Sequence, residues 1–480
     1  MTDSQVTESR RTEHEVPGEP VADAADTDAG DTGARAADGR VGWDKLDLVW
    51  CVALVLLAFT ISTLAVVRAT SLSPLDEASH LDYAWSVSHG TLPSAGSTMA
   101  PEVLKEWSCR SQEGAQYIIP PCGEAHPPSD YPVRGENYNY GHPPTYYTVT
   151  GLLARVGDAL PFGITFTTSA RLTGALWLSA ALIGLYLLVR VWRMPRLLAV
   201  AAAVVMASVP SVAHASSIVT NDAPGTLAGV LAFWVLTRVA VQGRLGWLLP
   251  TALALFVASI KVMHSVALLA VAGVLLVMAI AAFRAGDRGR GRSLGFISAG
   301  IVAATGLVHL GWSTFQGTRG DPNWLSPVEG INTKPVEGGP LREWLPTLFS
   351  GFGITQTFWL QAALTSFAVL ATARLLGVLL TASPFVTVSA FPAGDRRRLV
   401  GWVVLLGCAV VPLVVQVQAY LNGQDYFPGV SSRYSISLLP MALAGLVFIV
   451  QARRWRVATI AVTAFCLGAL LLSFGGFLTV

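Results

Sequence analysis

Residues 47–69 read DLVWCVALVLLAFTISTLAVVRA, an apolar run with an acid at its start and an arginine near its end. A run of about 20 apolar residues is long enough to cross the hydrocarbon layer of a bilayer, which is about 30 Å thick. Similar runs recur to the end of the chain. Over the whole sequence, apolar residues make up 52%, charged residues make up 13%, and mean hydropathy is +0.53. Soluble domains carry about 25% charged residues. The sequence therefore predicts an all-α, polytopic membrane helical bundle.

Residues 1–45 differ from the rest, because they are rich in Asp, Glu, Ala, Gly and Thr and nearly lack large apolar side chains. Such a segment buries too little apolar surface to offset its ordering entropy. It also lacks the apolar region and cleavage site of a signal peptide. We expect a disordered tail over 1–45 and a transmembrane domain over 46–480.

Basic clusters predict the orientation of the helices. They occur near 190–196, 238–244, 284–292, 396–398 and 453–456, and the tail ends in Arg40 and Lys45. Because Lys and Arg are enriched in cytoplasmic loops, we expect all of these segments on the cytoplasmic side. The chain is then a multi-pass protein of the cell membrane with a cytoplasmic N-terminus, and its first span ends outside.

Residues 145–158 are apolar but short, and Arg155 interrupts them. If they crossed the membrane, every later basic cluster would face outward, so we predict an interfacial helix on the outer surface. Large external loops are expected at about 70–168 and 314–356, the second with an amphipathic stretch at 341–349. About eleven spans remain. They are 47–69, 169–190, 197–214, 223–241, 246–260, 265–283, 294–313, 357–382, 399–418, 436–452 and 457–477.

The five cysteines fall into two groups. Cys51, Cys408 and Cys466 lie within apolar spans and are expected to be small core residues. Cys109 and Cys122 lie close together in the first external loop. Exported loops are oxidising surroundings, so we predict a disulfide between these two residues. It would add about 3 kcal/mol of stability in the chain-entropy model.

The stretch SPLDEASH, residues 73–80, follows the first span and holds Asp76, Glu77 and His80. Two adjacent acids at the outer end of a helical bundle can act as a catalytic base or bind a cation. Asp76, Glu77 and His80 are candidate metal ligands, and a divalent cation stays open. The alternative is a capping box in which Ser73 is the N-cap and Asp76 the third helical residue. That alternative leaves Glu77 and His80 unexplained.

Other polar residues gather at the expected outer ends of the spans: His142, Arg171, Asn221, Asp222, Lys261, His264, Arg433 and Tyr434. Ionisable groups at a membrane are costly unless they are paired or functional. Asp222 is alternatively a helix cap, and Lys261 and Arg433 are alternatively snorkelling residues. An arginine on the outer side opposes the charge bias, and a phosphate partner would justify it. An aromatic run at 138–147 indicates interface anchoring or a sugar-stacking surface.

Six pieces of sequence occur in an order that resembles the GT-C superfamily of membrane glycosyltransferases, near the protein mannosyltransferase and aminoarabinose transferase families. They are LDEASH at 75–80, GHPPTYY at 141–147, ARL at 170–172, TND at 220–222, Lys261 and SRY at 432–434. The resemblance covers most of the chain after residue 46. Two features depart from the family pattern, an insert at about 93–137 and His142 in its Pro-Pro motif.

The resemblance implies Asp76 as the catalytic acid. It implies a substrate-binding set of Glu77, His80, His142, Arg171, Asp222, Lys261, Arg433 and Tyr434. The donor would be a polyprenyl-phosphate-linked sugar drawn from membrane lipid. The acceptor would be a hydroxyl of an envelope glycan, glycolipid or protein, and the anomeric centre would invert. We expect neither a nucleotide cofactor, because no phosphate-binding fingerprint occurs, nor a nucleic-acid partner.

Two other classes of function remain open. A transporter or flippase would also have many helices, but its key groups should lie near the middle of the bilayer between related halves. A non-catalytic envelope scaffold could use the same fold without activity.

Overall fold

The computed structural model describes residues 44–113, 118–321, 323–325, 333–353, 355 and 360–478, without the side chain of Asn422. All of these residues belong to one compact unit. The tail predicted over 1–45 lies outside the described residues except for its last two positions.

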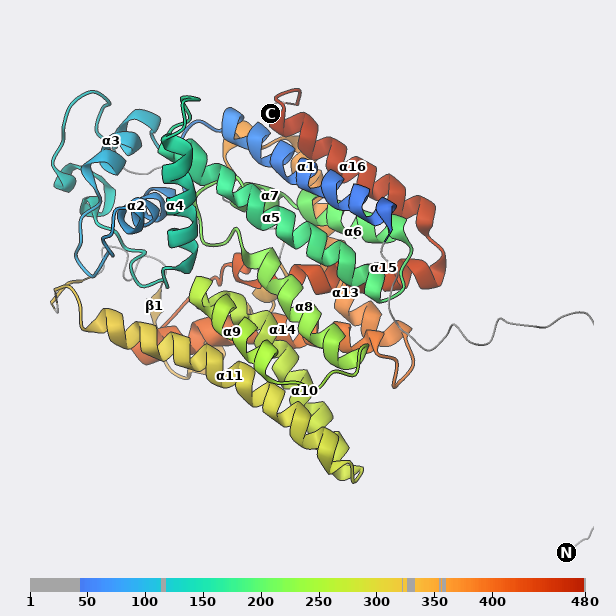
Figure 1. The fold of residues 1–480 in the computed structure, drawn as a ribbon. Helices are drawn as coiled ribbons and strands as arrows, with labels where there is room; N and C mark the ends of the chain where they lie inside the picture. The colour runs from blue at the N-terminus through green and yellow to red at the C-terminus, as the bar shows by residue number, and fades with distance from the viewer. Residues whose placement is uncertain are drawn as a thin grey trace, which may run out of the picture. The chain divides into compact units, whose positions relative to one another are not determined.

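Long helices dominate this unit (Figure 1). Eight helical stretches are long and apolar enough to cross a membrane by length and composition. They contain α1 (Lys45–Arg68), α5 (Phe166–Val191), α10 (Val266–Arg284), α11 (Arg288–Gly317), α13 (Phe367–Ala390), α14 (Arg397–Gly423), α15 (Leu439–Arg453) and α16 (Arg456–Phe474). Three shorter apolar helices are α6 (Arg196–Ser208), α8 (Gly225–Ala240) and α9 (Leu248–Ile260). The helical membrane class is confirmed, whereas the number of eleven spans stays a prediction.

Local chemistry explains where the helix bounds differ from expectation. The predicted span 197–214 is divided at Pro210, where α6 has ended and the short α7 (Pro210–Ala215) begins. A proline cannot donate the hydrogen bond that would continue a helix. The predicted span 357–382 begins only at Phe367, because the Ser366 side chain accepts a hydrogen bond from the Val369 amide and caps α13.

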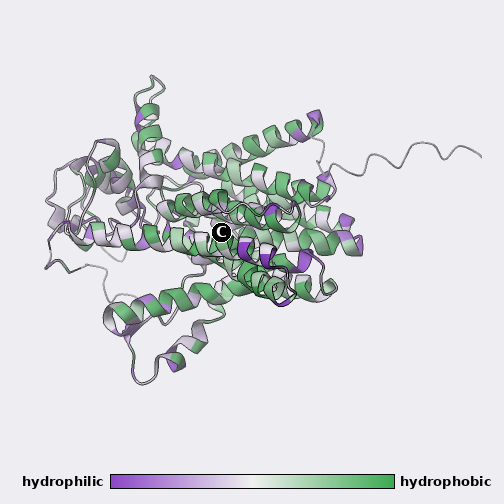
Figure 2. Ribbon diagram, turned by 60° about the horizontal axis from the view of Figure 1, so that its bottom comes forward, coloured by the Kyte–Doolittle hydropathy of each residue, from purple (hydrophilic) through white to green (hydrophobic). Residues whose placement is uncertain are grey.

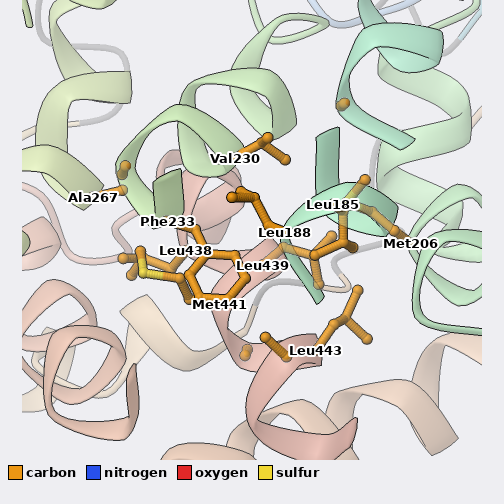
Figure 3. Packing of buried hydrophobic residues seen from close by; sticks show 14 of the residues in the cluster. Leu185, Leu188, Met206, Val230, Phe233, Ala267, Leu438, Leu439, Met441 and Leu443 are labelled. Carbon is orange, nitrogen blue, oxygen red and sulfur yellow. The ribbon is translucent and has the colours of Figure 1, made fainter. Parts of the chain in front are cut away.

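Apolar side chains fill the interior and also cover much of the outside. Leu185 and Leu188 of α5 belong to the same buried cluster as Val230 and Phe233 of α8 and Leu439 of α15 (Figure 3). Figure 2 shows hydrophobic residues along the long helices and hydrophilic residues at many helix ends and in loops. Large apolar side chains also face outward along the long helices, as lipid contact requires.

Helices α1 and α5 run in opposite directions, side by side. At one end, Asp47 of α1 accepts a hydrogen bond from Tyr186 at 2.5 Å and lies 3.5 Å from Arg190. At the other end, Arg171 donates to the Ala69 carbonyl at 2.6 Å. Helix α4 (Thr145–Asp158) lies between α1 and α5 in sequence, and Figure 1 shows it crossing their direction. This arrangement fits the prediction that residues 145–158 do not span the membrane beside α1 and α5. Its place at a membrane surface stays a prediction.

The expected outer loops carry short helices. The first holds α2 (Glu77–Ser88), α3 (Pro101–Arg110), η1 (Pro128–Asp130) and η2 (Pro132–Gly135). Elsewhere the short elements are η3 (Val262–Ser265), α12 (Pro340–Trp344), η4 (Leu345–Thr347), η5 (Ser350–Phe352), η6 (Ala362–Leu364) and η7 (Ser432–Leu438). Strands β1 (Lys334–Pro335) and β2 (Asp425–Tyr426) pair antiparallel, with Lys334 opposite Tyr426.

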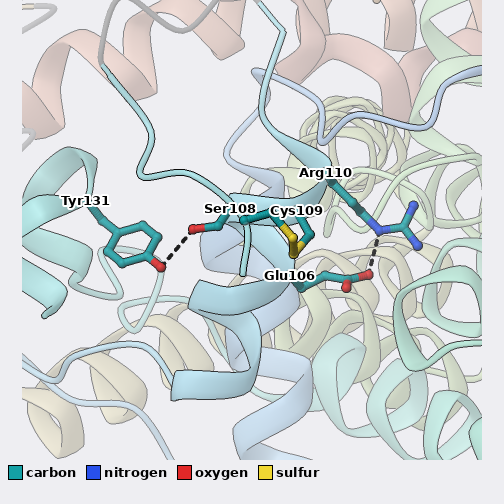
Figure 4. The surroundings of a disulfide bond; sticks show 6 residues. Glu106, Ser108, Cys109, Arg110 and Tyr131 are labelled. Carbon is teal, nitrogen blue, oxygen red and sulfur yellow. Dashed lines mark hydrogen bonds and ion pairs between the residues drawn. A yellow bond between two sulfur atoms is a disulfide. The ribbon is translucent and has the colours of Figure 1, made fainter. Parts of the chain in front are cut away.

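Cys109 and Cys122 form the predicted disulfide. Figure 4 shows it beside two side-chain contacts of α3: Ser108 with Tyr131, and Arg110 with Glu106. Of the cysteines expected in the core, Cys408 and Cys466 are buried, and Cys51 is half-buried.

Candidate active site

The deepest ionic contact joins Glu77, the first residue of α2, to Arg171 in the first turns of α5. Arg171 donates from Nε to Oε1 at 2.7 Å and from Nη2 to Oε2 at 2.8 Å. Glu77 also accepts from the Ser73 and Val219 amides, at 2.7 and 2.9 Å. Both side chains are buried. Because every Glu77 oxygen is already engaged, the geometry favours a supporting role for this pair over direct substrate contact.

Asp76 is placed differently from its neighbour. Its backbone is left-handed, with φ 59° and ψ 17°, and helix α2 begins after it. The capping-box alternative, with Ser73 as N-cap and Asp76 inside the helix, is wrong because α2 begins only at Glu77 and Asp76 itself occupies the N-cap position. The carboxylate is 36% exposed, and its Oδ1 accepts a hydrogen bond from the Tyr138 hydroxyl at 3.2 Å. Non-glycine residues in this backbone region are uncommon and tend to occur at functional sites.

Asp222 and Lys261 form a second buried pair. The Lys261 ammonium donates to Asp222 Oδ1 at 2.5 Å, and both side chains are nearly inaccessible. Burial by itself would raise the pKa of Asp222, but the positive charges of Lys261 and Arg433 outweigh it and hold the pKa well below its usual range. Helix α8 has Pro224 as its N-cap, so the capping alternative for Asp222 is wrong. Burial also rules out snorkelling for Lys261.

Arg433, in η7, lies between two carboxylates. Its Nη2 is 3.6 Å from Asp76 Oδ2, and its Nε is 3.8 Å from Asp222 Oδ2. These are ion pairs beyond normal hydrogen-bond length, and Nε has no hydrogen-bond partner within the described part of the chain. The Tyr434 ring centroid lies 5.5 Å from the Arg433 guanidinium carbon and 5.7 Å from Lys261 Nζ, within cation–π range. Arg433 therefore keeps donor capacity at the centre of the cluster.

Two histidines lie beside this cluster. His80 Nδ1 is 2.8 Å from the Tyr147 hydroxyl, and its ring is stacked 6.2 Å from that of His142. Enclosure and the nearby positive charges lower the pKa of His142 to about 3, and burial lowers the pKa of His80 well below its usual range. Both rings are therefore neutral at pH 7. A neutral imidazole offers one donor and one acceptor without adding to the positive charge around Arg433.

The candidate metal ligands do not come together. Glu77 is fully engaged with Arg171 and two amides, and His80 Nδ1 is engaged with Tyr147. Across the described residues there is no group of three or more His, Cys, Asp or Glu side chains arranged to hold a metal ion. Asp76, Glu77 and His80 are therefore not arranged to bind a metal ion together.

The structure thus brings most of the predicted site residues to one end of the bundle. Asp76, Asp222, Lys261, Arg433 and Tyr434 form one cluster, which we call the acid–arginine cluster. Glu77 with Arg171, and His80 with His142, adjoin it. The role of Tyr138 could not be found from its local sequence, which indicates only an aromatic run, because its partner Asp76 is 62 residues away.

Two comparisons relate this chain to known proteins. Residues 142–312 match the family model described as dolichyl-phosphate-mannose-protein mannosyltransferase. This match covers less than half of the chain, and over that segment it confirms the GT-C resemblance. It includes His142, Arg171, Asp222 and Lys261, and leaves Asp76 outside.

A solved structure is also similar, a crystal structure of ArnT from Cupriavidus metallidurans bound to undecaprenyl phosphate. The identity is 15% and the TM-score 0.39, over 87% of this chain and 63% of that chain. This chain therefore spans less than two thirds of the length of that protein. No curated protein matches the chain.

Proposed function

We propose that this protein is a membrane glycosyltransferase that moves a sugar from a polyprenyl-phosphate donor to an acceptor hydroxyl. The observation that carries the proposal is the acid–arginine cluster, in which a partly exposed carboxylate and an arginine held to it only by a long ion pair of 3.6 Å meet at one end of the bundle. The family match over residues 142–312 adds support, because its description names a polyprenyl-phosphate sugar. We expect the cluster on the outer side of the cell membrane.

Asp76 acts as the base in this proposal. Its carboxylate takes the proton of the acceptor hydroxyl while the acceptor oxygen forms a bond to the anomeric carbon. The bond from that carbon to the donor phosphate oxygen breaks, and the electron pair leaves with the phosphate. Attack from the side opposite the leaving group inverts the anomeric centre.

Arg433 binds the phosphate. Its planar guanidinium can donate two parallel hydrogen bonds to phosphate oxygens, and it stabilises the charge that develops as the donor bond breaks. Lys261 is already bonded to Asp222. We assign this pair to positioning Arg433. Asp222 stays opposite Arg433 Nε, while Arg433 Nη2 leaves Asp76 and binds the donor phosphate.

The test uses a deletion strain complemented with wild type, Asp76→Asn or Asp130→Asn. Asparagine tolerates left-handed backbone and removes the base, so we expect transfer to fall about 10²- to 10⁴-fold. Asp130 is an acid of the same loop with a side chain 48% exposed, and its variant should complement fully. Envelope glycans and polyprenyl-linked sugars are measured by mass spectrometry at matched protein levels.

A missing glycan with accumulated donor in the deletion and Asp76→Asn strains supports the proposal. If Asp76→Asn restores the glycan fully, Asp76 is not the base. Unchanged pools in the deletion strain would favour a transporter or a scaffold.

A further inference from the structure

A cavity lies among the outer loops, and none of the residues of the acid–arginine cluster lines it. Residues 94–97, 134, 136, 321 and 323–325 line it, and its volume is about 620 Å³. That volume falls within the range of about 300–1,000 Å³ typical of sites for small ligands. Much of its wall comes from the insert at 93–137, which departs from the family pattern.

Trp324 provides a rigid aromatic wall. Its indole Nε1 donates to Glu136 Oε2 at 2.6 Å, and its ring system is nearly perpendicular to the Tyr140 ring, with 5.3 Å between the centroids. The ring lies against Gly96, where a Cβ would be only 3.1 Å from Trp324 Cδ1. Gly96 has φ +77°, so the tight turn and the close approach both favour glycine.

Beside Trp324, the lining mixes the small or apolar residues Ala95, Gly96 and Leu325 with polar and charged side chains. Arg134 Nε lies 2.8 Å from Glu136 Oε1, so these two charges compensate each other. The third charged residue, Asp321, accepts a hydrogen bond from the Asn323 amide at 2.9 Å, and a carboxylate can also accept hydrogen bonds from sugar hydroxyls. Ser94, Ser97 and Asn323 supply neutral groups that can donate or accept hydrogen bonds. An aromatic wall with neutral polar groups fits a ligand that has an apolar face and a rim of hydroxyls, which describes a pyranose ring. It does not call for a charged ligand.

Tyr138 connects the cavity wall to Asp76. Glu136 lines the cavity, and two residues later the Tyr138 hydroxyl donates to Asp76. The Cα atoms of residues two apart are separated by about 7 Å at most. Tyr140, two residues further on, touches Trp324. One short stretch therefore contacts both the cavity wall and the acid.

That stretch is fixed firmly to α2. The Asn137 amide donates to the Ser79 carbonyl at 3.1 Å and to Asp82 Oδ2 at 2.6 Å, and its oxygen accepts from Ser79 Oγ at 3.0 Å. Asn137 is buried, and its backbone amide donates to Ser97 O at 2.9 Å, which ties in the 94–97 wall of the cavity. Cavity and acid are thus held in one rigid frame.

We propose that this cavity binds a neutral glycan of the acceptor, with a pyranose ring against Trp324, and so brings the acceptor hydroxyl to Asp76. This inference rests on the proposed function and extends it by naming the acceptor class. A sequence reading leaves glycan, glycolipid and protein acceptors open, and the cavity favours a carbohydrate chain.

The test is direct binding in detergent micelles, without lipid donor. The probes are short neutral oligosaccharides of mannose, galactose, glucose and arabinose. Their affinity is measured by titration calorimetry. We expect at least one series to bind wild type and Trp324→Ala to weaken its affinity roughly tenfold or more. Trp324→Phe, which keeps an aromatic face, should bind between the two. Trp455→Ala, an exposed tryptophan between α15 and α16, is the control and should bind as wild type.

Failure of this inference can be told from failure of the proposed function. Asp76→Asn should bind the oligosaccharide as tightly as wild type, because the variant keeps the frame. If no oligosaccharide binds, or if Trp324→Ala binds equally well, the glycan site is refuted even when Asp76-dependent transfer persists. Trp324-dependent binding of unglycosylated peptides instead of oligosaccharides would also refute it. If oligosaccharide binding holds but Asp76→Asn leaves transfer unchanged, the transferase mechanism fails and the glycan site stands.

Discussion

Replacing Glu77 with glutamine tests whether this acid supports the site or binds substrate. Glu77 accepts four hydrogen bonds, two of them from Arg171 and two from backbone amides. Glutamine keeps the shape but turns one acceptor oxygen into an NH₂ group that faces donors. The variant also leaves the Arg171 guanidinium buried without its counter-charge.

The expected magnitude follows from the burial of both partners. Removing one member of a buried ion pair costs about 3–5 kcal/mol, because the remaining charge has lost both water and partner. The control is Glu106→Gln, which breaks the Arg110–Glu106 pair at the surface of α3, where the side chains are 20% and 29% exposed. This pair keeps contact with water, so we expect a smaller loss than for the Glu77–Arg171 pair; pairs at the surface contribute about 0.2–1 kcal/mol.

The assay is the free energy of unfolding in detergent, followed by helical circular dichroism without substrate. Adding Arg171→Met to Glu77→Gln should recover part of the loss, since it removes the stranded charge. A Glu77→Gln protein within about 1 kcal/mol of wild type would refute the supporting role. If that stable variant also lost donor binding, Glu77 would be a substrate ligand, as the family resemblance implies.

Three further outcomes are expected. Arg433→Lys should weaken donor binding by about tenfold or more in a lipid-donor titration, because an ammonium cannot form the two parallel bonds of a guanidinium; unchanged affinity would remove the phosphate role. Serine at both Cys109 and Cys122 should lower the free energy of unfolding by about 3 kcal/mol relative to oxidised wild type, and reduced wild type should match the variant. Burial raises the pKa of Asp82 to about 6. The folded state then holds this proton more tightly than the unfolded state, so stability should fall as pH rises from about 4 to 6. In unfolding titrations, Asp82→Asn should remove this fall of stability between about pH 4 and 6. An unchanged profile would show that Asp82 does not cause the fall.

The sequence predicted those features that depend on composition and chain direction. Apolar runs located the long helices, because a membrane demands internally satisfied backbone over its whole thickness. Alternation of direction from span to span then placed Asp76, Asp222, Lys261 and Arg433 at one end, where the structure brings them together. The close spacing of two cysteines in one loop likewise gave the disulfide.

Pairing between distant residues could not be predicted in this way. Glu77 and Arg171 are 94 residues apart, and nothing in either local sequence shows that they share a hydrogen-bonded pair. The capping-box alternative at Ser73 was also wrong, because Asp76 precedes α2 in a left-handed conformation that the local sequence does not show. Similarly, Asp222 resembled a helix cap in sequence, whereas Pro224 holds that position.

The left-handed backbone of Asp76 also has an evolutionary consequence. Glycine, asparagine and aspartate adopt φ near 59° at lower cost than other residues, although this chain also places Gln424 and Arg454 there. A related chain that lost catalysis but kept this turn should therefore carry asparagine or glycine there, while one that lost the turn should accept other residues. Position 76 would thus separate inactive descendants that preserve the architecture from those whose outer loop has been rebuilt for another purpose.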